Sequence, residues 1–228
     1  MQCTRIFFVN ILLLFCLGAA QTVVRAHDES NAQSVSKVVG VTQLHYAVKA
    51  GNALLVADLL SNGGININSQ DPTSGQTALH VAVSYGLKKI TEMLIRHGAS
   101  VSLPSYDPVN PYPIHLAAIG NHEDILKMLI LSHANVDQRS VVGGRTALHK
   151  AAKIGLFSIV VTLVRAGRAD TSLKDNHGKT ALDIAVDNNW GEIVTFLKRY
   201  KDCLIADDKG SELETSQVED QDYDDKQG

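Results

Sequence analysis

The ten residues TALHVAVSYG, residues 77–86, return almost unchanged as TALHKAAKIG at residues 146–155. Three looser copies share the layout: TQLHYAVKAG from Thr42, YPIHLAAIGN from Tyr112 and TALDIAVDNN from Thr180. The fourth position of the five copies, with steps of 35, 35, 34 and 34 residues, is His45, His80, His115, His149 and Asp183. A fixed period of this length predicts a repeat protein.

Each copy predicts a helix, a turn and a second helix. A residue suited to a left-handed helix end follows each first segment: Gly51, Gly86, Asn121, Gly155 and Asn189. The second segments, such as EDILKMLI at 123–130, have apolar residues at helical spacing. Because neither helix can bury its apolar side alone, the copies should stack and share one core.

The first residue of most copies suits the start of a helix. Thr42, Thr77, Thr146 and Thr180 can accept a backbone N–H as N-cap residues. The third copy has Tyr112 instead, followed by a proline that is well tolerated as the first helical residue.

These features resemble the ankyrin repeat family over residues 42–200, through the T-x-L-H starts, the alanine pairs such as Ala151–Ala152 and the glycine between the helices. The resemblance implies an all-α fold, an ankyrin-repeat solenoid of about five helix–turn–helix units with β-hairpin fingers. Two departures are a period one or two residues longer than the usual 33, and Asp183 in place of histidine. The last unit is therefore expected to be an atypical cap.

The two ends of the chain differ from the repeats. Residues 6–17 form an apolar run behind Arg5, too short to span a membrane, and small residues follow. We expect a signal peptide; an uncleaved signal anchor and a lipoprotein signal using Cys16 are the alternatives.

The expected division of the whole chain is a signal peptide at 1–20 (cleavage as late as 26), a partly disordered lead-in at 27–41, repeats at 42–76, 77–111, 112–145 and 146–179, a capping fifth repeat at 180–201, and an acidic disordered tail at 202–228.

Charge and cysteine content limit the classes of function. The formal net charge of −3 gives no reason to expect a nucleic-acid partner. After signal removal Cys203 alone remains, so no internal disulfide is expected, and neither is a membrane span. We expect a monomer, exported from the cell, with the periplasm or the ER lumen as alternative compartments.

The sequence offers no convincing catalytic, cofactor or metal site. The recurring histidines should lie about 8–10 Å apart in packed helices, whereas zinc needs ligands at about 2 Å. In the family that the chain resembles, such histidines brace the turns. GKT at 178–180 lacks the glycine that a phosphate-binding loop needs five residues earlier, where Leu173 stands. We therefore expect neither an enzyme nor a cofactor.

Two stretches are candidates for recognition. LPSYDPVNPYP, residues 103–113, contains four of the five prolines, and proline and tyrosine together favour a stiff aromatic loop. A tolerated surface insertion is the alternative. Residues 139–179 hold eight Lys or Arg and two Asp. This patch could steer an acidic partner, meet the chain's own acidic tail, or be ordinary solvated surface.

The resemblance places partner contacts just after each T-x-L-H start and on the fingers. We call the proline-rich stretch at 103–113 the long finger. The site predicted from the resemblance, with two tyrosines of the long finger added, is Tyr46, Lys49, Val81, Ser84, Tyr85, Tyr106, Tyr112, Leu116, Ile119, Lys150, Lys153, Ile184 and Asp187. The expected function is an exported, non-enzymatic scaffold that binds a protein of unknown identity through the concave face and finger loops of the stack. The alternative is a periplasmic or ER-lumenal helper that stabilises a resident partner.

Overall fold

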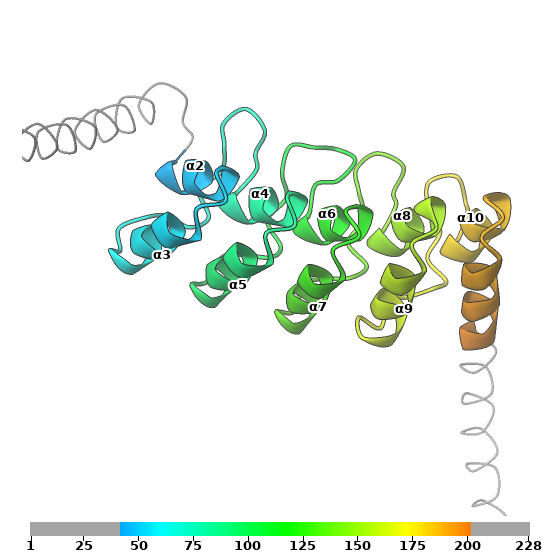
Figure 1. The fold of residues 1–228 in the computed structure, drawn as a ribbon. Helices are drawn as coiled ribbons and strands as arrows, with labels where there is room; N and C mark the ends of the chain where they lie inside the picture. Colours follow the sequence, from blue (N-terminus) through cyan, green and yellow to red (C-terminus); the bar gives the residue numbers. More distant parts are fainter. Residues whose placement is uncertain (1–41, 202–228) are drawn as a thin grey trace, which may run out of the picture.

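The computed structural model describes residues 42–201 as one row of helix pairs (Figure 1). The first helices of the pairs form one layer and the second helices form the other. The first layer holds α2 (Gln43–Lys49), α4 (Ala78–Ser84), α6 (Pro113–Ile119), α8 (Ala147–Ile154) and α10 (Ala181–Asp187). The second layer holds α3 (Ala53–Ser61), α5 (Lys88–Arg96), α7 (Glu123–Leu131), α9 (Phe157–Arg165) and the helix at 191–201. The expected all-α solenoid is confirmed.

Threonine caps start most of the first helices. In α4, the Thr77 hydroxyl lies 2.8 Å from His80 Nδ1 and accepts the His80 backbone N–H at 3.4 Å. The same arrangement is present at Thr42, and in α10 Asp183 takes the place of the histidine. Each of these hydroxyls satisfies a backbone N–H that would otherwise have no partner at the helix start. At Thr146 the hydroxyl lies 2.8 Å from His149 Nδ1, which also accepts the Thr146 backbone N–H at 3.3 Å.

The repeated histidines join each unit to the next finger. Their Nε2 atoms lie within hydrogen-bond distance of finger carbonyl oxygens: His45 to Gln76 at 2.9 Å, His80 to Pro111 at 3.0 Å, His115 to Gln138 at 2.9 Å and His149 to Lys179 at 3.2 Å. A carbonyl can only accept, so Nε2 carries the proton, and in His45, His80 and His149 the unprotonated Nδ1 accepts from the threonine hydroxyl. The third unit has Tyr112 in place of threonine, and the buried Nδ1 of His115 has no hydrogen-bond partner among the described residues.

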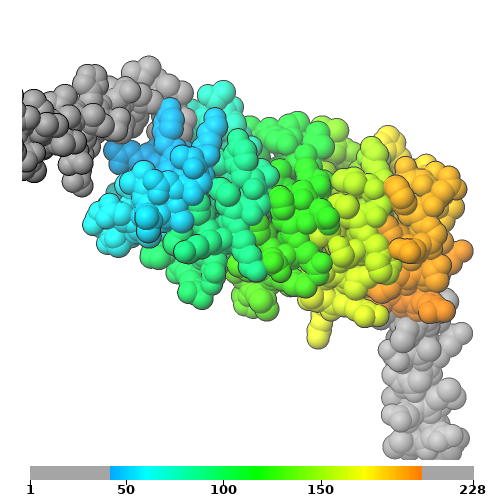
Figure 2. Space-filling view, viewed as in Figure 1, coloured from blue at the N-terminus to red at the C-terminus, as the bar shows by residue number. Residues whose placement is uncertain are grey.

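A continuous apolar core runs between the two layers. Small side chains such as Ala82, Ala118 and Ala152 are fully buried in the first helices, and leucines such as Leu94 and Leu129 are fully buried in the second. The alanines allow neighbouring first helices to approach closely. In the space-filling view the repeats follow one another as adjoining bands of one elongated body (Figure 2).

The fingers turn back on themselves but do not form the expected β-hairpin strands. Within residues 42–201 there is no strand, and one isolated antiparallel bridge joins Gln70 and Thr77. One or two backbone hydrogen bonds close each finger. The N–H groups of four residues donate to carbonyl oxygens across the base of the fingers: Asp71 to Gln76, Ser105 to Pro111, Ser140 to Arg145 and Asp175 to Lys179. In the first and last fingers Gly75 also donates to Asp71 and Gly178 to Asp175. The fingers are too short for longer ladders, and the prolines of the long finger have no N–H to donate.

Several predictions concern residues that the structure does not describe. The signal peptide, the lead-in at 27–41, Cys203 and the tail at 202–228 all lie outside the described residues. Between residues 42 and 201, no helix has the length and apolar character needed to cross a membrane.

Candidate protein-binding surface

The first helices and the fingers together form one long surface, which we call the inner face. The fingers rise beside the row α2, α4, α6, α8 and α10 (Figure 1). The predicted site residues lie on the first helices, just beyond the last residue of α4 at Tyr85, and on the long finger. The inner face is therefore the surface on which their exposure can be compared.

A pocket of about 200 Å³ opens on the inner face between the first two units. Four residues of the predicted site line it together: Tyr46 and Lys49 of α2, Val81 of α4, and Tyr85. Both tyrosines are well exposed, Tyr46 at 48% and Tyr85 at 59%. The pocket thus presents two accessible aromatic rings and one cation.

The remaining wall of this pocket comes from the first finger and from His45. Asp71 and Gln76 line it from the finger side. The Thr73 backbone N–H, which donates to Asp71 Oδ1 at 2.8 Å, lowers the pKa of that carboxyl group, so it is ionised at neutral pH. Both ring nitrogens of His45 already have partners, in Thr42 and Gln76, so this histidine is a structural part of the wall.

The other predicted residues divide by exposure. Those that are exposed are Ser84, Tyr106, Lys153 and Asp187; those partly buried are Tyr112, Leu116 and Ile119; those buried are Lys150 and Ile184. The exposed Asp187 pairs with Lys179, and the hydroxyl of Ser84 donates to the Val81 carbonyl. The pocket therefore gathers four of the predicted residues, and the others are spread along the stack.

Ile184, 4% exposed, is part of the apolar core and not of the surface predicted for it; Lys150 also differs from its predicted place. Only 7% of the residue is exposed, and its ammonium group donates a 2.6 Å hydrogen bond to the Val109 carbonyl of the long finger. Burial lowers the pKa of Lys150 to about 8. In this structure the side chain holds the chain's own finger, and its neighbour Lys153 is the lysine of α8 that faces solvent.

The long finger is fixed to its neighbours on both sides. Tyr106 donates its backbone N–H to the Ser74 carbonyl at 2.9 Å, and Val142 donates to the Pro108 carbonyl at 2.9 Å. The Tyr106 ring lies against Gly75, where a Cβ atom would come within 2.5 Å of it. Proline-rich chain and cross-finger hydrogen bonds together make this part of the inner face rigid.

Sequence reasoning missed a group of exposed apolar residues at the tips of the second and third fingers. Val109, Val141 and Val142 are 46%, 76% and 55% exposed, beside the exposed Tyr106. The adjacent valines at 141–142 in an otherwise polar link were the available signal. The contact between the two fingers could not be read from the sequence.

No metal site is apparent in the part of the chain that the structure describes. Among residues 42–201 no three His, Cys, Asp or Glu side chains are grouped so that they could hold an ion.

Comparison with known proteins shows which family matches the chain. The model of the family described as "Ankyrin repeats (3 copies)" matches residues 8–105 and 112–207. The chain belongs to the ankyrin repeat family. It is 32% identical over 163 residues to the tyrosine-protein kinase Shark of Drosophila melanogaster, covering 71% of this chain and 17% of that protein. It is also 32% identical over 158 residues to the nuclear factor NF-kappa-B p105 subunit of Gallus gallus, covering 69% of this chain and 16% of that protein.

A third relative is the B-cell lymphoma 3 protein homolog of Mus musculus, 33% identical over 149 residues, covering 64% of this chain and 32% of that protein. The chain thus spans between 16% and 32% of the length of these curated relatives. Membership of the ankyrin family indicates a protein–protein interaction scaffold.

Proposed function

We propose that this protein is an exported, non-enzymatic scaffold that binds a protein partner through its inner face. The observation that carries the proposal is the pocket between the first two units, where Tyr46 and Tyr85 are exposed beside Lys49. Exposed tyrosines that flank a pocket are typical anchors of protein interfaces.

The chemistry of the pocket suggests the kind of segment that binds there. Tyrosine offers a broad apolar ring and a polar hydroxyl, and it has few torsions to order on binding. Lys49 adds a cation at the edge, and a carboxylate of the partner would be attracted to it. We infer that the partner places an apolar or aromatic side chain between Tyr46 and Tyr85 and an acidic residue near Lys49.

The rest of the inner face supports such binding by being preorganised. The histidine–carbonyl hydrogen bonds fix each finger to the unit before it, and the Lys150 ammonium group fixes the long finger to α8. A surface that is already ordered loses less conformational entropy when a partner binds.

A peptide-display selection tests the proposed pocket. Peptides selected on the whole protein should combine an aromatic or apolar residue with Asp or Glu. Their affinity should fall at least about tenfold for Tyr46→Ser/Tyr85→Ser, which removes both anchors. The control is Leu54→Ser/Leu131→Ser, which removes exposed apolar side chains of α3 and α7, away from the inner face. Equal loss in both double variants, or none in the first, would reject the pocket.

Export is tested separately, because it concerns residues outside the described part of the chain. Comparison of culture medium with cell extract, combined with amino-terminal sequencing, should find the protein outside the cell and beginning between residues 21 and 27. Retention in the periplasm or the ER lumen with the leader removed would favour the helper of a resident partner. An intact leader in the cell extract would reject export.

A further inference from the structure

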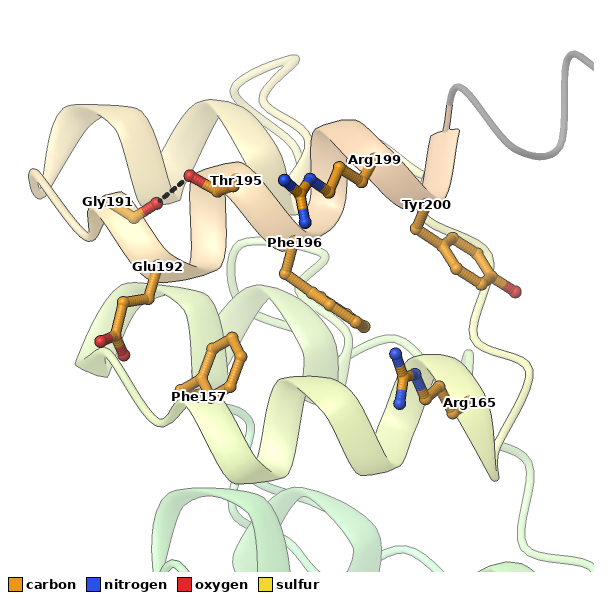
Figure 3. A pocket seen from close by; sticks show the side chains of 8 residues that line it. All are labelled: Phe157, Arg165, Gly191, Glu192, Thr195, Phe196, Arg199 and Tyr200. Atoms are coloured by element: carbon orange, nitrogen blue, oxygen red, sulfur yellow. Dashed lines mark hydrogen bonds between the residues drawn. The ribbon is translucent and has the colours of Figure 1, made fainter.

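An open groove with aromatic lining residues lies on the second layer of helices, on a different surface from the inner face. It has a volume of about 820 Å³ and runs between α9 and the helix at 191–201 (Figure 3). Phe157 and Phe196 meet edge to face with centroids 5.9 Å apart, and Tyr200 stacks on Phe196 at 6.4 Å. Three of the eight residues that line the groove, Phe157, Phe196 and Tyr200, are aromatic.

Two arginines give the groove a positive charge. The Arg165 guanidinium lies over the Phe196 ring, 5.5 Å from its centroid, and Arg199 lines the groove from the opposite helix. Glu192 is the acidic residue that lines the groove. Within residues 42–201, neither arginine takes part in an ion pair. A ligand that carries carboxylates beside apolar side chains would suit this surface.

The chain itself supplies a segment of this chemistry directly after the last residue that the structure describes. Tyr200 lines the groove, and the segment at 202–228 follows directly after Lys201. That segment has ten Asp or Glu and two Lys. Its later apolar residues, Leu213, Val218 and Tyr223, are spaced five apart among the acidic ones.

We propose that the acidic segment at 202–228 docks on its own molecule in this groove. Its carboxylates face Arg165 and Arg199, and one of its apolar side chains covers the row from Phe157 to Phe196. The twelve residue-to-residue steps from Lys201 to Leu213 can span up to about 40 Å at about 3.3 Å each, whereas α9 is only about 13 Å long at 1.5 Å per residue. The tether also gives the segment a local concentration on the order of millimolar, which compensates for weak individual contacts.

Photo-crosslinking within the full chain tests the proposal. Tyr223 is replaced by p-benzoylphenylalanine, the protein is irradiated at low salt, and the crosslinked peptides are identified by mass spectrometry. We expect crosslinks at monomer mass to the peptides that contain Phe157–Arg165 or residues 191–201. We also expect the yield to fall steeply as salt is raised from 0.01 M to 1 M, because the Debye length shrinks from about 30 Å to about 3 Å.

Charge reversal distinguishes the groove from general attraction. Arg165→Glu/Arg199→Glu should reduce the groove crosslinks about tenfold, since two attractions become repulsions. The matched control is Arg168→Glu/Lys198→Glu, which makes the same charge change at neighbouring exposed positions that do not line the groove, and should keep most of the yield. Circular dichroism and thermal melting establish that both variants are folded.

Three results would overturn the proposal. Crosslinks at dimer mass would assign the groove to a second copy of the chain. Crosslinks scattered over the surface, or concentrated on the fingers, would show that the segment does not dock in the groove. An equal loss of yield in the two charge-reversal variants would show that the attraction is not specific to Arg165 and Arg199.

Discussion

The Lys150 ammonium group lies 2.6 Å from the Val109 carbonyl oxygen, to which it donates a hydrogen bond across 41 positions of sequence. The contact ties α8 to the tip of the long finger. Burial lowers the pKa of Lys150 to about 8, and the carbonyl partly replaces the water that the ammonium group has lost. A residue expected to contact a partner is thus part of the scaffold that shapes the inner face.

Replacing Lys150 with methionine should loosen the long finger. Met has a similar length but no donor, so the Val109 carbonyl loses its charged partner. We expect amide hydrogen exchange of Asp107 and Val109 to become roughly tenfold faster, as the loss of one charge-assisted hydrogen bond implies. Exchange measured by NMR checks this. Lys153→Met, on the exposed side of the same helix, is the control and should leave the finger unchanged.

Thr77→Val should destabilise the stack by about 1–2 kcal/mol. Valine keeps the shape of threonine but removes the buried hydroxyl that caps α4 and lies 2.8 Å from His80 Nδ1. Urea unfolding at pH 7 measures the change. Thr73→Val is the control, because Thr73 is exposed on the first finger. A loss as large in Thr73→Val would argue against the cap as the cause.

The buried histidines should make the protein less stable at mildly acidic pH. Burial lowers the pKa of His80, His115 and His149, in His115 from 6.5 to about 4. Between these values the unfolded chain binds a proton that the folded chain does not, so the free energy of unfolding falls as the pH falls. His115 alone should lower it by roughly 2 kcal/mol between pH 7 and pH 5.

Denaturant unfolding at these two pH values measures the effect. His115→Gln removes the titrating group, so the difference between pH 7 and pH 5 should shrink by roughly the same 2 kcal/mol, even though the variant is less stable at pH 7. His97→Gln is the control, because His97 is exposed at the end of α5. An unchanged pH dependence in His115→Gln would refute the assignment.

Gly155→Ala should disturb the packing of Trp190. Gly155 has a φ of 91°, and a Cβ atom there would lie 2.5 Å from the Trp190 ring. Gly51 holds the equivalent place in the first unit, with a φ of 66° and nothing within 4 Å of a Cβ. Gly51→Ala should cost about 1 kcal/mol through backbone strain alone, and Gly155→Ala roughly 1 kcal/mol more.

The fluorescence of Trp190 reports on the same change, because it is the only tryptophan of the chain. Its indole N–H donates to the Lys153 carbonyl at 3.3 Å. We expect the emission maximum to shift in Gly155→Ala and to stay in place in Gly51→Ala. Equal spectra and equal melting temperatures in the two variants would contradict the proposed contact.

Much of the architecture was predictable because it depends on local patterns that recur. The T-x-L-H starts, the glycines after the first helices and the apolar spacing of the second helices all act within one unit. The exposure of the site residues was not predictable to the same degree. Lys150 and Lys153 look equivalent as exposed basic residues in the sequence, and the Val109 carbonyl of a distant finger makes them different.

The sequence by itself therefore determined the repeat, the helix pairs, their caps and the all-α stack, because each unit repeats the same local pattern of capping, apolar and glycine residues. The tertiary structure alone decided how the surfaces are built. It brought Tyr46 together with Tyr85 and Phe157 with Phe196, residues separated by 39 positions in each case. Such residues come to line one surface only because neighbouring units stack, and the packing of each finger then decides which side chains remain exposed to a partner.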